Sequence, residues 1–473
     1  MADITYNRPE YEEAAPRWRM VSDACAGQHA VAAGGYLVRP NPSDKTPAAE
    51  DRWLQYQARA VYYNATGRTK EALTGIAYRR WPEIVLPDAM NGLLADVDGT
   101  GRPLIQQSQG ALSGLLETGR GVLLTDFPAA GGVSSKDALA RDGIRSTITH
   151  YGADALVNWR TGRVGNRYVL TLAVLTEQHE EEDGYGTRTV EQRRELALED
   201  GVYVHRLHRK LDGRWAAVEE VTPKKANGQP WRELPLIVLG ATANGPDIGP
   251  IPLYDIATLN LAHYRNSADY EDSAYICGQP QVWVAGLDET WRDELYKQGA
   301  YIGSRSVLAL PQGGTAGIMQ AQPNTLAREA MQDKEQQMAA LGARMLHRGE
   351  AVKTATQQDS EDAAAHSVLS LCCDNVSAGY TKALQFAQEF EGASDEVDFA
   401  MSTEFVTDTL DPAVLRELLA AVQAGHLPQT DLWAKFREWN LIDPSKDDEM
   451  VRDEIEGQGG AVTLDDDGEA GTR

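Results

Sequence analysis

The sequence predicts an α+β protein with helical segments, one β-rich unit, and two long helices on either side of a small insert. Helical spacing of apolar residues dominates the first 130 residues. Short strand-like segments separated by turns follow between about residues 144 and 240. Two uninterrupted helical patterns then flank residues 277–322. With 42% hydrophobic and 24% charged residues, the 473-residue chain has the composition of a globular protein with a sizeable core.

The N-terminal 130 residues are expected to be mostly helical. Residues 40–44, Pro-Asn-Pro-Ser-Asp, are a loop signal. Residues 122–124 predict a short buried strand that ends near Asp126. The helical spacing is carried by Trp53, Tyr56, Ala60 and Tyr63, and later by Leu112, Leu115 and Leu116.

The segment between about residues 144 and 240 predicts a mostly antiparallel β unit. The pairs Gly165-Asn166, Asp200-Gly201 and Asp212-Gly213 are hairpin signals between its strands. The predicted strands lie at residues 144–148, 168–175, 195–198, 203–207 and 215–221. A linker rich in Gly and Pro, residues 241–250, closes the unit.

Two long helices and a compact insert follow. The first helix is expected from Pro252 to about Tyr275, a length of about 36 Å. Its polar-interrupted stripe favours packing beside other helices over an isolated surface helix. The second helix begins near Asn324, an N-cap residue after Pro323, and runs to about His347. Between them, strands at 281–284 and 306–310, a helix at 289–297 and a Gly-rich stretch at 312–314 form the insert.

A polar stretch at 349–360 separates the second long helix from a third, expected at 361–391 and ending at the C-cap residue Gly392. Shorter helices are expected at 412–424 and 430–439. From residue 443 the chain is rich in Asp and Gly, so the sequence predicts a disordered acidic tail.

Charge is the unusual feature of the composition, with a formal net charge of −25. Tight duplex binding relies on Lys and Arg that displace counterions, so this acidic chain is a poor candidate for it. Its four cysteines have no zinc-ligand spacing, which suits a reducing compartment. No signal peptide is visible, and no apolar run reaches the length of a membrane span.

The motifs of common enzymes are absent from the sequence. It contains no P-loop, no nucleophile elbow and no H-E-x-x-H pair. Residues 96–101 echo a calcium loop, but Gln107 occupies the place of the bidentate Glu, so we expect an acidic turn between helices. The acidic run 179–183 is expected at a solvated hairpin tip. We therefore expect neither a metal, nor a cofactor, nor catalysis, and we interpret His263 as a packing or interface residue.

The order of long helix, insert, long helix, polar break and longer helix resembles that of bacteriophage portal proteins. Several strings strengthen this resemblance across roughly residues 5–440. They are Tyr56 to Gly75, residues 96–99, Gly119-Arg120 leading into residues 126–128, Leu259 to Glu271 followed by 278–280, and Lys353 to Thr356 before an Ala-rich helix. They look like one portal family that is often described only as a domain of unknown function.

The resemblance implies a portal fold, divided as follows. Residues 1–250 would form the wing, with its β-rich unit from about 144. Residues 251–276 and 323–348 would be the two stem helices, and 277–322 the clip between them. Residues 349–391 would hold the channel (tunnel) loop and a long helix, 392–442 the helical crown, and 443–473 the tail.

The resemblance also implies function and partners. A portal forms a homo-oligomeric ring, usually a dodecamer, at one capsid vertex, and conducts double-stranded viral DNA during packaging and ejection. It docks the terminase large subunit first and the head-completion, adaptor and tail proteins later. It also contacts the major capsid and scaffolding proteins. The implied location is the virion, after assembly in the host bacterial cytoplasm.

Three sets of candidate site residues follow from this resemblance. Transient DNA contacts in the channel are assigned to Lys334, Arg344, Arg348, Lys353, Thr354, Thr356 and Gln357. Docking of terminase or an adaptor on the clip is assigned to Glu289, Trp291, Asp293 and Glu294. Packing of stem helices in the ring is assigned to Asn260, His263, Tyr264 and Tyr270.

Each set has an alternative. Arg348 and Lys353 would equally serve salt bridges between subunits, with Glu335, Glu350 or Asp359. Trp283 is expected to pack the core of the insert rather than face a partner. For the whole chain, the alternatives are another structural virion protein, such as an adaptor or minor capsid protein, and a soluble enzyme of an unrecognised class.

Overall fold

The computed structural model describes residues 3–126, 145–279, 281–298, 310–319, 325–346 and 367–403, and in the C-terminal part residues 405, 416, 420–422, 424, 426, 428–438, 442 and 446–457. The chain divides into two units, Met1–Thr403 and Glu404–Arg473. Both helix and sheet are present, so the predicted α+β class is confirmed.

Helices dominate the first 118 residues, as predicted. The side chain of Thr46 caps the N-terminus of α3, and Asn64 does the same for α4. The helices are α1 Pro9–Ala26, α2 Gln28–Ala33, α3 Pro47–Arg59, α4 Ala65–Ala77, α5 Gly92–Ala95 and α6 Leu104–Thr118, with a 3-10 turn at Asp88–Met90. The helix that the spacing of residues 53–63 predicts is too long. Helix α3 ends at Arg59, and the backbone of Ala60 is extended.

A three-stranded antiparallel sheet lies under α6 and the long helix α11 (Val368–Glu391). Its order is β3 (Thr147–Gly152), β2 (Arg120–Asp126), β9 (Leu236–Gly240). The predicted buried strand at 122–124 is confirmed as the centre of β2, since its residues are almost fully buried. Strand β2 is the central strand of this sheet and is buried on both faces, which explains the continuous apolar run of residues 122–124.

A second antiparallel sheet holds β4 to β8 in chain order. Its strands are β4 Leu156–Val164, β5 Arg167–Asp183, β6 Gly186–Glu199, β7 Val202–Leu211 and β8 Arg214–Val221. The turns at Asp200-Gly201 and Asp212-Gly213 have positive φ at both residues, as their sequences predict. Strand β4 escaped prediction because register shifts beside Asn158 and Thr161 break its alternation.

One apolar core joins the two sheets to α11. Leu124, Trp159, Tyr203, Trp231 and Phe386 are among its buried members. The rings of Trp231 and Phe386 meet edge to face with centroids 5.6 Å apart. The core of the two sheets is therefore closed by a helix from the far end of the first unit.

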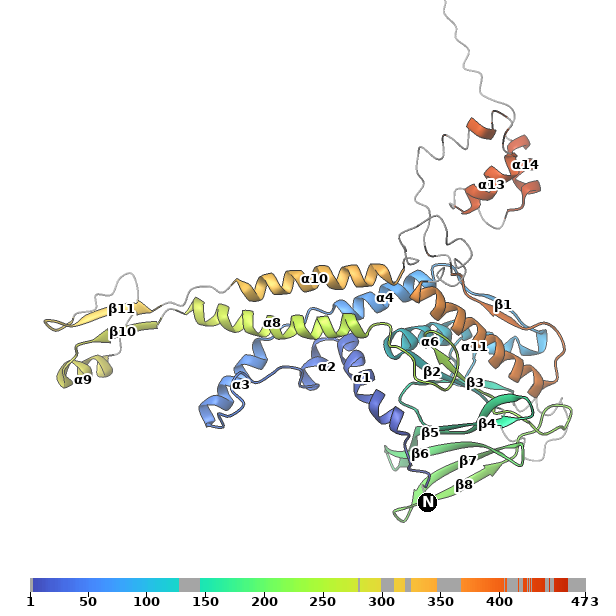
Figure 1. The fold of residues 1–473 in the computed structure, drawn as a ribbon, viewed down its shortest axis with the longest axis horizontal. Coiled ribbons are helices and arrows are strands. Elements are labelled where there is room, and N and C mark those ends of the chain that lie inside the picture. Colours follow the sequence, from blue (N-terminus) through green and yellow to red (C-terminus); the bar gives the residue numbers. More distant parts are fainter. Residues whose placement is uncertain are drawn as a thin grey trace, which may run out of the picture. The chain divides into compact units, whose positions relative to one another are not determined.

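Two long helices, α8 (Tyr254–Gly278) and α10 (Leu326–Arg344), lie side by side (Figure 1). Both predicted stem helices are confirmed as helices, within a few residues at their ends. Between them in the chain come β10 (Gln281–Ala285), α9 (Glu289–Gln298) and β11 (Thr315–Met319). Strand β10 pairs antiparallel with β11. The strand predicted at 306–310 falls almost entirely outside the described residues.

Helix α11 begins after the N-cap Ser367 and ends at Gly392, whose φ of 71° is left-handed. The predicted C-cap is confirmed, whereas the predicted start at 361 lies outside the described residues. A short pair of strands, β1 (Glu83–Val85) and β12 (Asp398–Ala400), links the N-terminal helices to the chain after α11. No described helix is long and apolar enough to cross a membrane.

The second unit contains α13 (Gln429–Glu438) and α14 (Asp448–Gly457), joined by an ion pair between Arg437 and Asp448. Helix α13 matches the helix predicted at 430–439. The predicted disorder from residue 443 is wrong for 448–457. Asp448 and Glu449 in the first turn favour a helix N-terminus, and the buried Val451 gives the helix an apolar contact.

Candidate functional site

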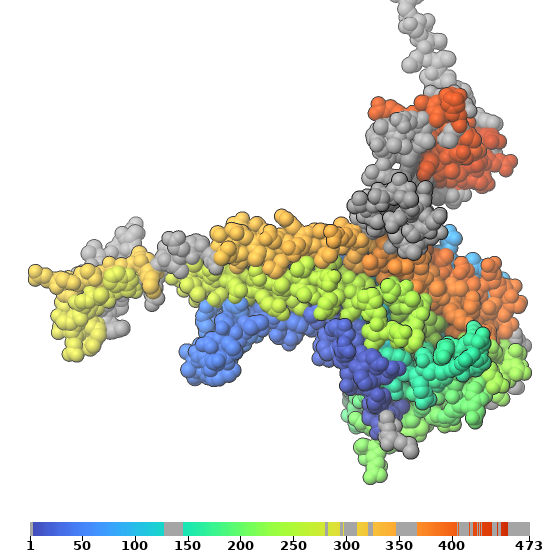
Figure 2. All heavy atoms as spheres, in the orientation of Figure 1, coloured from blue at the N-terminus to red at the C-terminus, as the bar shows by residue number. Residues whose placement is uncertain are grey.

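The candidate functional site is the pair of long helices α8 and α10 together with the insert that joins them. Figure 2 shows the two helices as adjacent bands, with the insert at their end remote from the sheets. Met338, the buried methionine of α10, lies within this helix pair. Near its C-terminal end α10 also approaches α4, where a Cβ on Gly342 would lie 3.4 Å from Thr69.

Asn260 is the polar hub of α8 and is fully buried. Its Oδ1 accepts hydrogen bonds from the Tyr62 hydroxyl at 2.8 Å, from the Thr66 backbone N–H at 3.0 Å and from the Thr66 hydroxyl at 2.9 Å. Its Nδ2 donates to the Tyr63 carbonyl at 2.7 Å. One side chain thereby anchors α8 to the start of α4 and to the extended segment before it.

His263, one turn further along α8, bridges to α10. Its Nε2 lies 3.1 Å from Glu335 Oε1, and the Tyr63 ring lies 5.7 Å from the imidazole, centroid to centroid. The adjacent Tyr264 is buried edge to face against Tyr62. The expectation that His263 is a packing residue is thus confirmed within the chain.

The assignment of Asn260, His263 and Tyr264 to contacts between copies needs correction. All three side chains are buried against other parts of the same chain, so they are not on the surface that a neighbouring copy would meet. Tyr270 is half-buried and keeps part of its surface free. The sequence could not reveal this, because the partners Tyr62 and Thr66 lie about two hundred residues away.

Helix α3 braces the far half of α8 with charged and aromatic contacts. Asp272 of α8 binds both Arg52 and Arg59, and the Arg59 guanidinium stacks 3.6 Å above the Tyr275 ring. The Tyr56 hydroxyl donates to Asp269 at 2.7 Å. Burial, followed by this hydrogen bond, raises the pKa of Tyr56. These contacts fix the direction of α8 where it leaves the core.

The insert exposes the residues that the sequence assigned to docking. Glu289, Trp291 and Asp293 all lie on the exposed surface of α9, and Asp293 pairs with its neighbour Arg292 at 3.0 Å. The side chain of Glu294 is outside the described residues. Trp283 of β10 covers Gly317 of β11, so its ring partly packs the insert, as predicted, while 45% of its surface stays exposed.

Two of the seven proposed channel residues lie within the described residues. Lys334 is half-buried, and its ammonium donates to the Ala330 carbonyl at 3.2 Å. Arg344 is exposed on the last turn of α10. The other five, at 348, 353, 354, 356 and 357, lie outside the described residues, and so does the polar stretch that we expect to form the channel loop.

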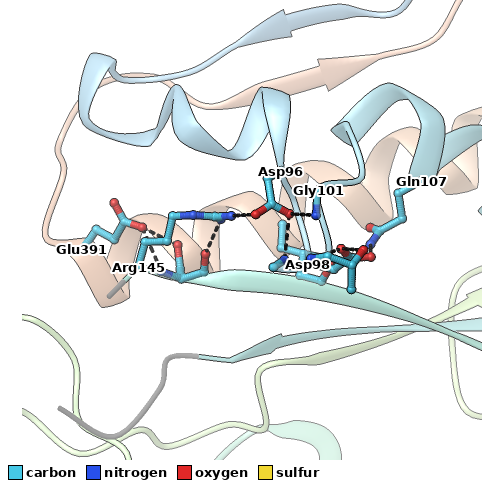
Figure 3. A network of polar contacts seen from close by, with 10 residues as sticks. Asp96, Asp98, Gly101, Gln107, Arg145 and Glu391 are labelled. Atoms are coloured by element: carbon cyan, nitrogen blue, oxygen red, sulfur yellow. Dashed lines mark hydrogen bonds and ion pairs between the residues drawn. The ribbon is translucent and has the colours of Figure 1, made fainter. Parts of the chain in front are cut away.

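The acidic turn at residues 96–101 belongs to a polar network (Figure 3). Asp96 accepts from the backbone N–H groups of Gly99 and Gly101 and from Arg145 at 2.6 Å. Gln107 donates to Asp98 at 3.3 Å and to the Ile148 carbonyl at 2.8 Å. The expected turn between helices, here α5 and α6, is confirmed, and its carboxylates have protein partners.

Glu391, the last residue of α11, extends this network to the start of β3. Its carboxylate accepts from the backbone N–H of Ser146 at 3.1 Å and from the Ser146 hydroxyl. The neighbouring Arg145 points the other way, to Asp96 (Figure 3). The end of α11 is thereby held to the same strand end as the acidic turn.

A buried charged cluster between the sheets was not anticipated from the sequence. Glu177 accepts from Arg194 and Gln192, each at 2.5 Å, and from the Tyr151 hydroxyl at 2.6 Å. Burial alone would raise the pKa of Glu177, but the hydrogen bonds and charge of Arg194 outweigh it, so the net pKa is below its usual value. Burial and Arg194 lower the pKa of His205. These groups satisfy one another, as in a structural network.

Metal-ligand clusters and cavities are the other features of the described part of the chain that bear on a candidate site. No group of three or more His, Cys, Asp or Glu there is placed to hold a metal ion. A 670 Å³ cavity lies between the N-terminal segment and the five-stranded sheet, lined among others by Arg8, Trp159 and His208. A 690 Å³ cavity between α3 and α8 is lined by Trp53, Asp272 and Ile276, among others.

Comparisons with known proteins add the following. Residues 252–391, from α8 to the end of α11, match a family model described as "Domain of unknown function (DUF4055)". No curated protein matches the sequence. A chain from the neck of an empty gene transfer agent particle is 15% identical with a TM-score of 0.42, over 86% of this chain and 97% of that one. A chain from the virion of a native gene transfer agent particle is 15% identical with a TM-score of 0.41, over 88% and 98%.

Proposed function

We propose that this chain is the subunit of a phage portal, a ring through which viral DNA enters and leaves the capsid. The observation that carries the proposal is the block from α8 to α11. Two long helices lie side by side, a small α/β insert joins their remote ends, and a third long helix returns to the core. This is the order of stem, clip, stem and tunnel helix in portal proteins.

The distribution of charge supports a conduit better than a DNA-binding protein. Twelve copies at −25 each would carry a formal charge of −300. Such a ring repels duplex DNA, so that DNA slides through it instead of adhering. The few contacts with DNA are assigned to cations on α10 and beyond its end, namely Lys334, Arg344, Arg348 and Lys353.

The insert is proposed as the docking surface for the terminase large subunit and later for head-completion and tail proteins. Exposed Trp291 between Glu289 and Asp293 is the kind of aromatic anchor that dominates protein interfaces. No catalytic activity is proposed for the chain itself, and no cofactor.

Electron microscopy of the purified full-length chain, with its mass measured in solution, tests the proposal. We expect rings with a central hole and about twelvefold symmetry, because a head-to-tail contact that closes gives cyclic symmetry. Some portals need other capsid components to assemble. A chain that stays monomeric even with its scaffolding and capsid proteins would overturn the proposal.

Binding of terminase to assembled rings tests the docking surface. Trp291→Ala should weaken this binding at least about tenfold, as truncation of a central aromatic anchor does. Trp283→Ala is unsuitable as a control because Trp283 packs against Gly317. Trp81→Ala, in the segment between α4 and β1, is the matched exposed-tryptophan control. Unchanged terminase affinity of intact Trp291→Ala rings would contradict the assignment.

A further inference from the structure

The hairpin between β4 and β5 is an isolated basic surface on an acidic chain. Residues 160–168, here called the basic hairpin, hold Arg160, Arg163 and Arg167, and the sequence has no Asp or Glu between Asp154 and Glu177. All three arginines are exposed. Arg163 bonds only within its own turn, and in the described structure no carboxylate lies within ion-pair distance of any of the three.

The basic hairpin also presents an aromatic ring. Tyr168 pairs directly across the strands with Arg163, so their side chains share one face. Tyr168 is 80% exposed. The last residues of the hairpin extend past the end of β6, which stops at Glu199 and begins its pairing with β5 at Leu172. The surface is therefore accessible from both faces.

The opposite end of strand β5 carries the complementary charge. Residues 180–188, here called the acidic hairpin, contain Glu180 to Asp183 and one cation, Arg188, which gives a net charge of −3 against +3 for the basic hairpin. Its turn also exposes an aromatic ring, Tyr185. None of its four carboxylates forms an ion pair in the described structure.

The two hairpins cannot neutralise each other within one molecule. Strand β5 runs from Arg167 to Asp183, and its 17 residues span about 55 Å. The Debye length at physiological salt is about 8 Å, so the two ends do not sense each other. Neither hairpin is neutralised by the other end of the strand, so an oppositely charged partner for either one would come from another molecule.

We propose that the basic hairpin of one copy of this chain binds the acidic hairpin of the next copy. The inference rests on the proposed ring and names one of its contacts. Complementary surfaces at opposite ends of one subunit form a head-to-tail interface, and such an interface closes into a ring when the rotation between copies allows it. Arg160, Arg163 and Arg167 then meet Glu180 to Asp183, and Tyr168 adds apolar area.

Charge reversal and its rescue test this contact. Arg163→Glu with Arg167→Glu reverses the basic hairpin, and Glu181→Lys with Glu182→Lys reverses the acidic one. Each pair of substitutions should raise the protein concentration at half-assembly about tenfold or more, because like charges then face each other. The variant with all four substitutions should return to within about threefold of the native chain, since complementarity is restored with opposite sign.

Two controls accompany the reversal. Arg163→Lys with Arg167→Lys keeps the charge at the same positions and should assemble like the native chain. Circular dichroism of every variant shows that the sheet is folded, which is expected because these side chains are exposed. Raising the salt should weaken the native contact and the four-substitution contact alike.

Three outcomes would overturn the contact, and they differ from failure of the ring. If the native chain forms rings and each reversal leaves half-assembly within about twofold, the hairpins do not meet. If both reversals impair assembly but the four-substitution variant is not rescued, the two hairpins bind different partners. If reversal of the basic hairpin changes only duplex DNA binding, its partner is nucleic acid. If the native chain never assembles, the ring and this contact fail together.

Discussion

Asn260 shows how one buried amide can define the start of a long helix. Its four hydrogen bonds use the acceptor three times and the donor once, and they join α8 to residues 62–66. Asn side chains with this set of partners cannot be replaced by a carboxylate or an alkyl group without leaving a buried polar group unsatisfied.

Asn260→Ala is therefore expected to reduce the free energy of unfolding by about 3 kcal/mol, since buried groups of Tyr62, Tyr63 and Thr66 lose partners. Urea unfolding followed by tryptophan fluorescence measures the change. Asn266→Ala, on the same helix but half-exposed, is the matched control and should change the stability by less than about 0.5 kcal/mol. If the two substitutions lowered the free energy of unfolding equally, the assignment of Asn260 as a buried hydrogen-bonding hub would be wrong.

The Glu177–Arg194 pair gives the first unit a predictable pH dependence. Because the net pKa of Glu177 is lowered in the folded chain, the pair contributes its full stability above the usual value of 4.5. As the pH falls below 4.5, the unfolded chain takes up the proton first. The stability is then lost progressively as the pH falls through the folded-state pKa.

Glu177→Gln tests this account at the same residue. At pH 7 it should cost about 3 kcal/mol, because buried Arg194 loses its nearest anionic partner and keeps only the more distant Asp126, at 3.4 Å. At pH 3 the native carboxyl is closer to neutral, so the difference between the two proteins should shrink. Denaturation curves at both pH values measure this, and a difference that is the same at each would refute the pairing.

At the scale of elements, the close approach of α11 to the three-stranded sheet depends on one glycine. Gly379 faces β9, and a Cβ built on it would fall on the Leu239 side chain and within 3.7 Å of Leu123. Both leucines are fully buried, so neither has room to move away. At this point the backbone of α11 packs directly against the Leu239 side chain of β9.

Gly379→Ala should therefore destabilise the protein by about 1–3 kcal/mol through overpacking, although Ala is the better helix former. Gly110 on α6 is exposed with open space around its Cβ position. Gly110→Ala should instead stabilise by about 0.5–1 kcal/mol. Thermal unfolding of both variants gives the two signs, and stabilisation by Gly379→Ala would show that α11 is not packed as described.

At the scale of the whole molecule, the net charge of −25 governs the encounter with DNA. Many of the described cations pair with carboxylates of the same chain, as Lys70 does with Glu117 and Arg145 with Asp96. Such internal pairing reduces the number of cations that can displace counterions from a duplex.

The full-length chain should accordingly bind duplex DNA with a dissociation constant weaker than about 10⁻⁴ M at physiological salt. Fluorescence anisotropy of a labelled duplex across the micromolar range measures this. Saturable submicromolar binding would contradict the sliding conduit. If the chain instead bound duplex DNA through the basic hairpin, the double substitution Arg163→Glu with Arg167→Glu would abolish that affinity for DNA.

Local patterns predicted most elements, because each depends on residues close in sequence. The long helices α8 and α10, the buried strand β2, the turns at Asp200-Gly201 and Asp212-Gly213 and the stop at Gly392 all follow from periodicity, turn chemistry or capping. The misses have local causes too. Register shifts hid β4, glycines at 313, 314 and 317 hid β11, and an acidic composition hid α14.

The sequence by itself determined the class of fold, the order of its elements and the acidic charge. Only the tertiary structure decided which polar residues are buried and which are exposed. Asn260, His263 and Tyr264 proved to be enclosed by residues distant in the chain, while the basic and acidic hairpins proved to lie at opposite ends of one strand. Burial and charge pairing are set by residues far apart in sequence, whereas helix periods, caps and turns are set by neighbours.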